Sequence, residues 1–156
     1  MEDYHKLKSA SRASITLWLL GASFTFFIFT ANISPELFHE NGLFSLQITI
    51  TIPLLLSSAF SRSRQAYSKH PDKWNKYSFF TFILGYGFLI NVIGTILGNF
   101  GGLKIGLIFF GVNILSDLSY SFVALHEQKK WFKLYKSAFF ISILFLGGIL
   151  PLVGIY

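Results

Sequence analysis

The sequence predicts an all-helical protein that crosses a membrane five times, with residues 1–156 forming a single transmembrane domain. The chain is 53% hydrophobic and 19% aromatic but only 13% charged, whereas a soluble domain carries about 25% charged residues. So few charges cannot cover a water-facing surface, and so much apolar surface argues against disorder. The lengths of the apolar runs and the distribution of basic residues between them then predict the number and direction of the spans.

Five apolar runs occupy residues 13–33, 43–60, 77–97, 105–125 and 137–156. A bilayer core needs about 20 helical residues to cross it. A transmembrane barrel would instead show alternating polar and apolar residues, and four of the five runs are continuously apolar. Each run therefore predicts a membrane-spanning helix.

The second run is the weakest of the five, because Gln47, Thr49, Thr51 and Pro53 interrupt it. Proline removes a backbone donor and crowds the preceding turn, so we expect a helix kinked at Pro53. The run is also short enough for a re-entrant loop, and this alternative stays open.

Basic residues predict the direction of the chain, because Lys and Arg gather in cytoplasmic connections. Twelve of the 13 basic residues fall on one side of a five-span chain. They are Lys6, Lys8 and Arg12 before the first span, Arg62, Arg64, Lys69, Lys73 and Lys76 in the second connection, and Lys129, Lys130, Lys133 and Lys136 in the fourth. In the first and third connections together, Lys104 is the one Lys or Arg. We expect a cell-membrane protein with a cytoplasmic N-terminus and an outside C-terminus.

The net charge of +6 follows from this bias. Anionic lipid headgroups and the bilayer are the expected partners. Nucleic acid is not, because the basic residues are split among short connections beside apolar spans. The first span could also be a cleaved signal peptide, but the run is long for one and no small-x-small site follows it, so an uncleaved helix is favoured.

The second and fourth connections resemble each other. Lys73-Trp74 precedes one span, and Lys130-Trp131 with Lys133 precedes another. Two helix hairpins repeated in the same orientation after the first span would explain this similarity. So would the general preference of Trp and Lys for the membrane interface, where these residues anchor helices. Both explanations stay open.

Two short helices are predicted in the connections. Ser34 can cap a helix over residues 34–42, and Gly42 can end it. Residues 128–136 place lysines on one helical face and aromatic residues on another, which predicts a short helix lying among the headgroups.

Metal and cofactor sites have little support in the sequence. Glu36, His39 and Glu40 share one face of the first short helix at a metal-clip spacing, yet a functional site needs three or four ligands, so a solvated polar face is the favoured interpretation. The chain has no cysteine, and none of its four histidines lies in a span. We therefore expect no thiolate site, no haem and no other cofactor.

Asp117 is the most informative polar residue, because it lies twelve positions or so into an apolar run. A charged carboxylate at that depth costs a few kcal/mol, and protonation is the cheapest way to avoid this cost. Asn113 lies one helical turn earlier on the same face, and Tyr120 lies one turn later. A protonated acid can donate a hydrogen bond and can exchange a proton.

The preceding span offers a complementary face formed by Gly87, Asn91, Gly94 and Gly98. Small residues at GxxxG spacing let helix backbones approach closely. We expect the third and fourth spans to pack there, so that two amides and a carboxyl face each other in a low-dielectric site. Ordinary interhelical hydrogen bonding explains the two asparagines equally well.

The residues exclude an enzyme more clearly than they identify a function. No known catalytic motif and no pair of intramembrane carboxylates is present. We expect a small channel or transporter, or its subunit, handling protons or a small cation or solute through Asp117, Asn113, Asn91 and Tyr120. Five helices cannot easily enclose a path, so this function implies a homo-oligomer. The alternative is a non-catalytic accessory or scaffold subunit with a membrane-protein partner.

Overall fold

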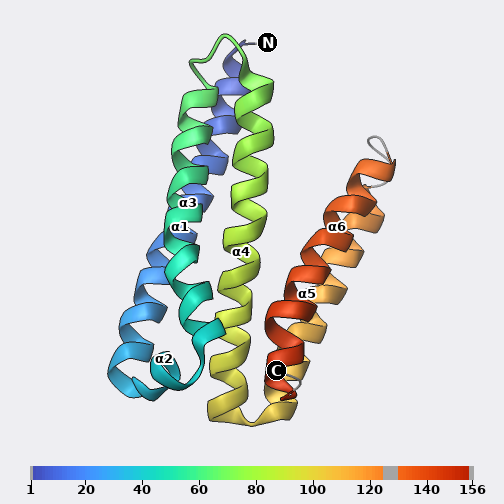
Figure 1. Ribbon diagram of the computed structural model, residues 1–156. Helices are drawn as coiled ribbons and strands as arrows, with labels where there is room; N and C mark the ends of the chain where they lie inside the picture. The colour runs from blue at the N-terminus through green and yellow to red at the C-terminus, as the bar shows by residue number, and fades with distance from the viewer. Residues whose placement is uncertain (1, 125–129, 155–156) are drawn as a thin grey trace. The chain divides into compact units, whose positions relative to one another are not determined.

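The computed structural model describes the backbone of residues 2–124 and 130–154, together with their side chains except those of residues 2–6, 8, 39–40, 124 and 130–133. Helices dominate this part of the chain, and no strand occurs in it (Figure 1). The predicted all-helical class is therefore confirmed.

Five helices are long and apolar enough to cross a membrane. They begin with α1 (Glu2–Ile33), α3 (Gly42–Gln65) and α4 (Pro71–Gly101). The fourth is α5 (Leu103–Ala124), and the fifth starts as α6 (Lys130–Leu144) and continues through a π-helix, η1 (Phe145–Ile149), into α7 (Leu150–Leu152). A short helix, α2 (Glu36–Glu40), lies in the first connection. The predicted number of candidate spans is thus confirmed.

Several helices extend beyond the apolar runs that predict them. The first begins at Glu2 and the third span begins at Pro71, where proline suits the first helical turn because its missing N–H has no partner there. Hydropathy marks only the part of a helix that fits the bilayer core, whereas backbone hydrogen bonding continues into polar sequence. Gly102, with φ of 85°, ends the long helix α4.

The second span is one continuous helix of 24 residues that runs through Pro53. Proline is tolerated in membrane helices because neighbouring hydroxyls re-satisfy the freed backbone groups. At this length the segment can cross a bilayer completely, which favours a span over a re-entrant loop.

The first connection differs from its prediction at both ends. Ser34 does not cap the short helix, since Pro35 occupies the cap position and makes no side-chain hydrogen bond there. Gly42 does not end that helix but begins α3, and the Asn41 side chain accepts a hydrogen bond of 2.9 Å from the Phe44 N–H. Asparagine is among the best N-caps, so it starts the long helix where Gly42 was expected to stop the short one.

The separate headgroup helix predicted for residues 128–136 is also corrected. Residues 130–136 are the first turns of α6 and continue without a break into the last span. Gln128 and Lys129 lie outside the described residues.

The chain divides into two compact units, Met1–Leu89 and Ile90–Tyr156, and α4 contributes to both. The single domain expected for residues 1–156 stays a prediction. In unit 1, α1, α3 and the first part of α4 form an antiparallel bundle, with α2 at the turn between the first two (Figure 1). Its core includes Phe44, Ile48 and Leu55 of α3.

Serine hydroxyls link the helices of unit 1 to one another. Ser9 of α1 donates to the carbonyl oxygen of Arg62 on α3. Ser58 of α3 donates to the carbonyl oxygen of Ser78 on α4 at 2.9 Å. Such hydrogen bonds between spans replace the hydrophobic driving force that lipid removes.

The Phe110 ring lies at the centre of the tightest packing in unit 2. Phe110 of α5 is fully buried, and a Cβ added to Gly94 or Gly148 would come within 2.3 or 2.5 Å of its ring. A Cβ on Gly106 would lie 3.0 Å from the Cα of Gly98. Glycines therefore permit the end of α4, α5 and the π-helix to approach one another.

Candidate functional site

The carboxyl group predicted to matter most, that of Asp117, is held by the last span. Ser137 of α6 donates a hydrogen bond from its hydroxyl to the Asp117 Oδ2 atom on α5. Ser137 is buried and Asp117 is half-buried. The carboxyl thus lies at the seam between two neighbouring helices, and one of its oxygens is already partnered by a hydroxyl.

The position of Ser137 in its helix indicates how deep Asp117 lies in the membrane. The apolar parts of the two helices are Leu103–Val123 and Leu134–Leu152. Ser137 lies about one turn from the start of the second of these, and Asp117 lies roughly 9 Å from the end of the first at 1.5 Å per residue. Both therefore lie toward the basic fourth connection rather than at the middle of the spans, and Lys136 is the next residue in the chain to the Asp117 partner.

Asn113 and Tyr120 continue the Asp117 face along α5. The Asn113 Nδ2 atom donates to the carbonyl oxygen of Phe109 in its own helix at 2.9 Å. This leaves the amide oxygen as an acceptor one turn before the carboxyl. Tyr120, one turn after Asp117, is 75% exposed. The face is thus a stripe of oxygen atoms with an exposed phenol at its end.

Asn91 takes part in a different contact. It is 1% exposed, and its Nδ2 atom donates to the carbonyl oxygen of Ile143 on α6 at 3.1 Å. Its Oδ1 atom is buried and has no hydrogen-bond partner in the described part of the chain, and a Cβ on Gly148 would lie 2.6 Å from it. The amide therefore sits against the segment where α6 changes into the π-helix. Such segments occur mostly as local bulges and are frequent at functional sites.

The expected convergence of two amides and a carboxyl is therefore not what the hydrogen bonds show. Asn91, Asn113 and Asp117 each have a different partner. Two of these partners, Ile143 and Ser137, belong to α6, which the sequence reasoning left out of the site. The signal available in the sequence was the Gly147-Gly148 pair followed by Pro151, which marks the irregular part of the last span.

The remaining predicted packing and anchor residues lie in both units. Gly87 is buried, and the side chain of Leu152 fills the space above Gly98. The Arg64 guanidinium lies 5.4 Å from the centre of the Trp74 ring, which is typical of an interfacial anchor. The side chains of Trp131, Lys130 and Lys133 lie outside the described residues.

The weak metal candidates gain no support. Glu36 is exposed, and the side chains of His39 and Glu40 lie outside the described part of the chain. The described residues contain no group of three or more His, Cys, Asp or Glu side chains that could hold a metal ion.

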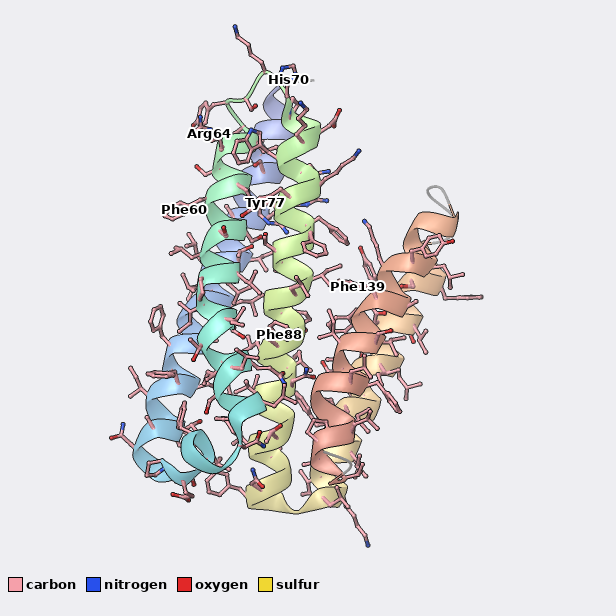
Figure 2. All side chains as sticks on the ribbon, in the orientation of Figure 1. Phe60, Arg64, His70, Tyr77, Phe88 and Phe139 are labelled. Atoms are coloured by element: carbon pink, nitrogen blue, oxygen red, sulfur yellow. The ribbon has the colours of Figure 1, made fainter. Side chains whose placement is uncertain are left out.

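Sequence reasoning missed one buried ionic residue, Arg62, because it counted this residue among the solvated basic loop. Arg62 is only 7% exposed. Its Nε atom donates to the Ser58 Oγ atom at 3.4 Å, and its guanidinium lies 5.0 Å from the centre of the Phe82 ring. Figure 2 labels its exposed neighbour Arg64 close to the connection that holds His70. The serine-rich sequence just before Arg62 was the available signal of a packed helix face.

Comparison with protein families, with curated proteins and with solved structures finds no match to this chain. What can be argued about function therefore rests on the chemistry of its own residues.

Proposed function

We propose that the chain is a subunit of a membrane channel or transporter that handles protons or a small monovalent cation through a polar site centred on Asp117. The observation that carries this proposal is the hydrogen bond from Ser137 to Asp117 at the seam of two apolar helices. Ionisable residues within spans are costly and mark ion or proton pathways by default. We propose no enzymatic activity.

The groups around Asp117 suit a proton or a hard cation. A carboxylate, a hydroxyl and the Asn113 amide oxygen are oxygen ligands, and cations of this class prefer oxygen. The Ser137 hydroxyl stabilises the charged carboxylate by donating to it. When a proton or cation arrives, the hydroxyl can rotate and accept instead, so the same pair serves both states.

The site requires neighbouring copies of the chain. Five helices supply too few walls for both a path and a lipid-facing surface. Leu115, Leu118 and Tyr120 on α5 are exposed. We propose that this surface meets a second copy, so that polar stripes of several subunits line one path.

The direction of the chain belongs to the same proposal. The basic connections lie on the cytoplasmic side of the cell membrane. The two helix hairpins that follow α1 are repeats of one unit in the same orientation. Since the chain has no cysteine, single Glu36→Cys, Lys69→Cys and Lys104→Cys variants report sidedness directly. We expect a membrane-impermeant thiol reagent added outside to label the first and third but not the second.

Flux in reconstituted vesicles tests the function. Protein in vesicles that contain a pH-sensitive dye should move protons, or a monovalent cation measured in parallel, and Asp117→Asn should reduce the rate to that of protein-free vesicles. Ser137→Ala should slow flux, because it removes the partner of the carboxylate. Ser142→Ala is the matched control, since this serine of the same helix bonds only to its own backbone, at the carbonyl oxygen of Ala138. Unchanged flux in Asp117→Asn would remove Asp117 from the mechanism.

An accessory subunit is the second candidate, and one observation favours it. Phe122 and Val123 follow the polar stripe at the end of α5, and both side chains are exposed. A partner membrane protein could cover these residues and bring its own cation to Asp117. Purification in mild detergent separates the two functions: a defined homo-oligomer supports transport, and a foreign chain in fixed proportion supports the accessory role.

A further inference from the structure

Arg62 is a buried cation without a counter-charge among the described side chains. Its side chain is at least nine-tenths buried, and the hydrogen bond from Nε to Ser58 is long, at 3.4 Å. The Phe82 ring faces the guanidinium at 5.0 Å but carries no charge. Among the side chains that the structure describes, no carboxylate pairs with Arg62. Within the described part of the chain, the hydrogen bond of the guanidinium uses Nε and leaves its two terminal nitrogens for another acceptor.

A second cation adds to this imbalance. The positive charge of Arg12 on α1 acts on Arg62 on α3. Ser9, one turn before Arg12, binds the carbonyl oxygen of Arg62, which fixes α1 against this end of α3. Two like charges held close together by packing raise the free energy of the fold unless an anion joins them.

We propose that Arg62 and Arg12 bind a phosphate group at this end of unit 1. Guanidinium groups match phosphate in planar, two-pronged hydrogen bonds, which is why arginine is preferred where phosphate is recognised. Arg62 supplies a buried guanidinium that Ser58 and Phe82 hold in place, and Arg12 supplies the second positive charge. The site lies in the other unit from Asp117 and does not depend on the proposed function.

Phosphate reaches this position from one of two sources. The headgroup of an anionic phospholipid lies at the depth where a span ends, and Arg62 stands near the end of the apolar helix Gly42–Gln65. A soluble phosphate or phosphate ester could enter from the aqueous side, where the exposed Lys69 and Lys73 raise the local concentration of anions. The chemistry of recognition is the same for both.

Thermal unfolding in a neutral detergent tests the site. Each variant is measured alone, with phosphatidylglycerol, with phosphatidylcholine as the zwitterionic control, and with inorganic phosphate. The variants are Arg62→Met and the matched control Arg64→Met, which removes the same charge two residues away from an exposed position. Ligand at a hundredfold excess over its Kd should raise the Tm of the wild type and of Arg64→Met by about 5–10 °C. Arg62→Met should gain no more than phosphatidylcholine gives.

The Tm of Arg62→Met without ligand gives an independent prediction. The variant loses stabilisation by the anion but should not lose stability of its own. Because none of the described carboxylates pairs with Arg62, Arg62→Met should unfold at the same temperature as the wild type or above it. Stabilisation by phosphatidylglycerol alone identifies a lipid headgroup as the source, and stabilisation by inorganic phosphate identifies a soluble phosphate. Equal stabilisation of Arg62→Met and Arg64→Met by the anion overturns the proposal. So does a large fall in the Tm of Arg62→Met without ligand, since it would show that the guanidinium is already stabilised within the chain.

Discussion

The two units place groups of opposite charge against the same kind of side chain. Unit 1 buries the Arg62 guanidinium beside Ser58, and unit 2 places the Asp117 carboxyl against Ser137. A serine hydroxyl can accept from a cation or donate to an anion, so it adapts to either charge without a change of fold.

The units differ in what their interhelical hydrogen bonds depend on. In unit 1, Ser9 and Ser58 donate to backbone carbonyl oxygens, whose acceptor strength does not change with pH. In unit 2, Ser137 donates to a carboxyl that can gain a proton or a cation. The helix contact in unit 2 is therefore sensitive to the state of one ionisable group, whereas the contacts in unit 1 are not. This difference favours unit 2 as the responsive part and unit 1 as the scaffold.

The units also differ in how closely their helices approach. Around Phe110 in unit 2, Gly94 and Gly148 leave room for the ring, and any side chain there would overlap it. In unit 1, a Cβ on Gly85 would lie no closer than 3.1 Å to the side chain of Leu55, and nothing lies within 4 Å of a Cβ on Gly21. Packing in unit 2 thus requires that Gly94 and Gly148 have no Cβ atom. We expect substitutions at these glycines to be tolerated less well than substitution of Gly21 in unit 1.

The largest expected effect comes from filling that space. Gly94→Ala should lower the free energy of unfolding by about 1–3 kcal/mol, because the new Cβ would lie 2.3 Å from the buried Phe110 ring. Gly21→Ala is the control and should be neutral or stabilising by up to about 1 kcal/mol, because alanine favours the helix and meets nothing. Denaturant unfolding followed by circular dichroism measures both. Equal effects of the two variants would contradict the difference in packing.

Much of the fold could be predicted because each apolar run carries its own evidence. Residues 77–97 and 105–125 are long and almost free of charge, so their helices need no tertiary information. Positions at the helix ends were less predictable, since Asn41 and Gly42 each suit two roles and the competition between neighbouring helices decides between them.

The polar site was only partly predictable. The sequence identified Asp117 as unusual from its apolar neighbours alone, but the register between spans depends on packing across the seam. Ser137 lies 20 residues from Asp117 in the chain, and no local pattern links the two. Arg62 was misjudged for the same reason: its burial comes from the helices around it, not from its own neighbours in sequence.

An intermediate effect is expected from the links between helices in unit 1. Ser58→Ala removes the hydrogen bond to the Ser78 carbonyl oxygen and the long one from the Arg62 Nε atom. It should cost about 0.6–1.7 kcal/mol, from the average to the maximum for such bonds between spans. Thr25→Ala is the control, because this exposed hydroxyl bonds only to Gly21 in its own helix. The two variants are compared by thermal unfolding in detergent. A loss in Thr25→Ala as large as that in Ser58→Ala would show that these hydroxyls act within helices and not between them.

The smallest effect on stability is expected at Asp117, where the effect on function should be greatest. The asparagine of Asp117→Asn can accept the same hydrogen bond from Ser137 through its amide oxygen, so the unfolding free energy should change by less than about 0.6 kcal/mol. Thermal unfolding of Asp117→Asn is measured beside its flux, with Ser137→Ala as the variant that breaks the bond itself. Loss of flux with stability retained would separate the chemistry of the carboxyl from its packing. A large loss of stability in Asp117→Asn would instead show that the negative charge itself holds α5 to α6, and unit 2 would then be a scaffold of the same kind as unit 1.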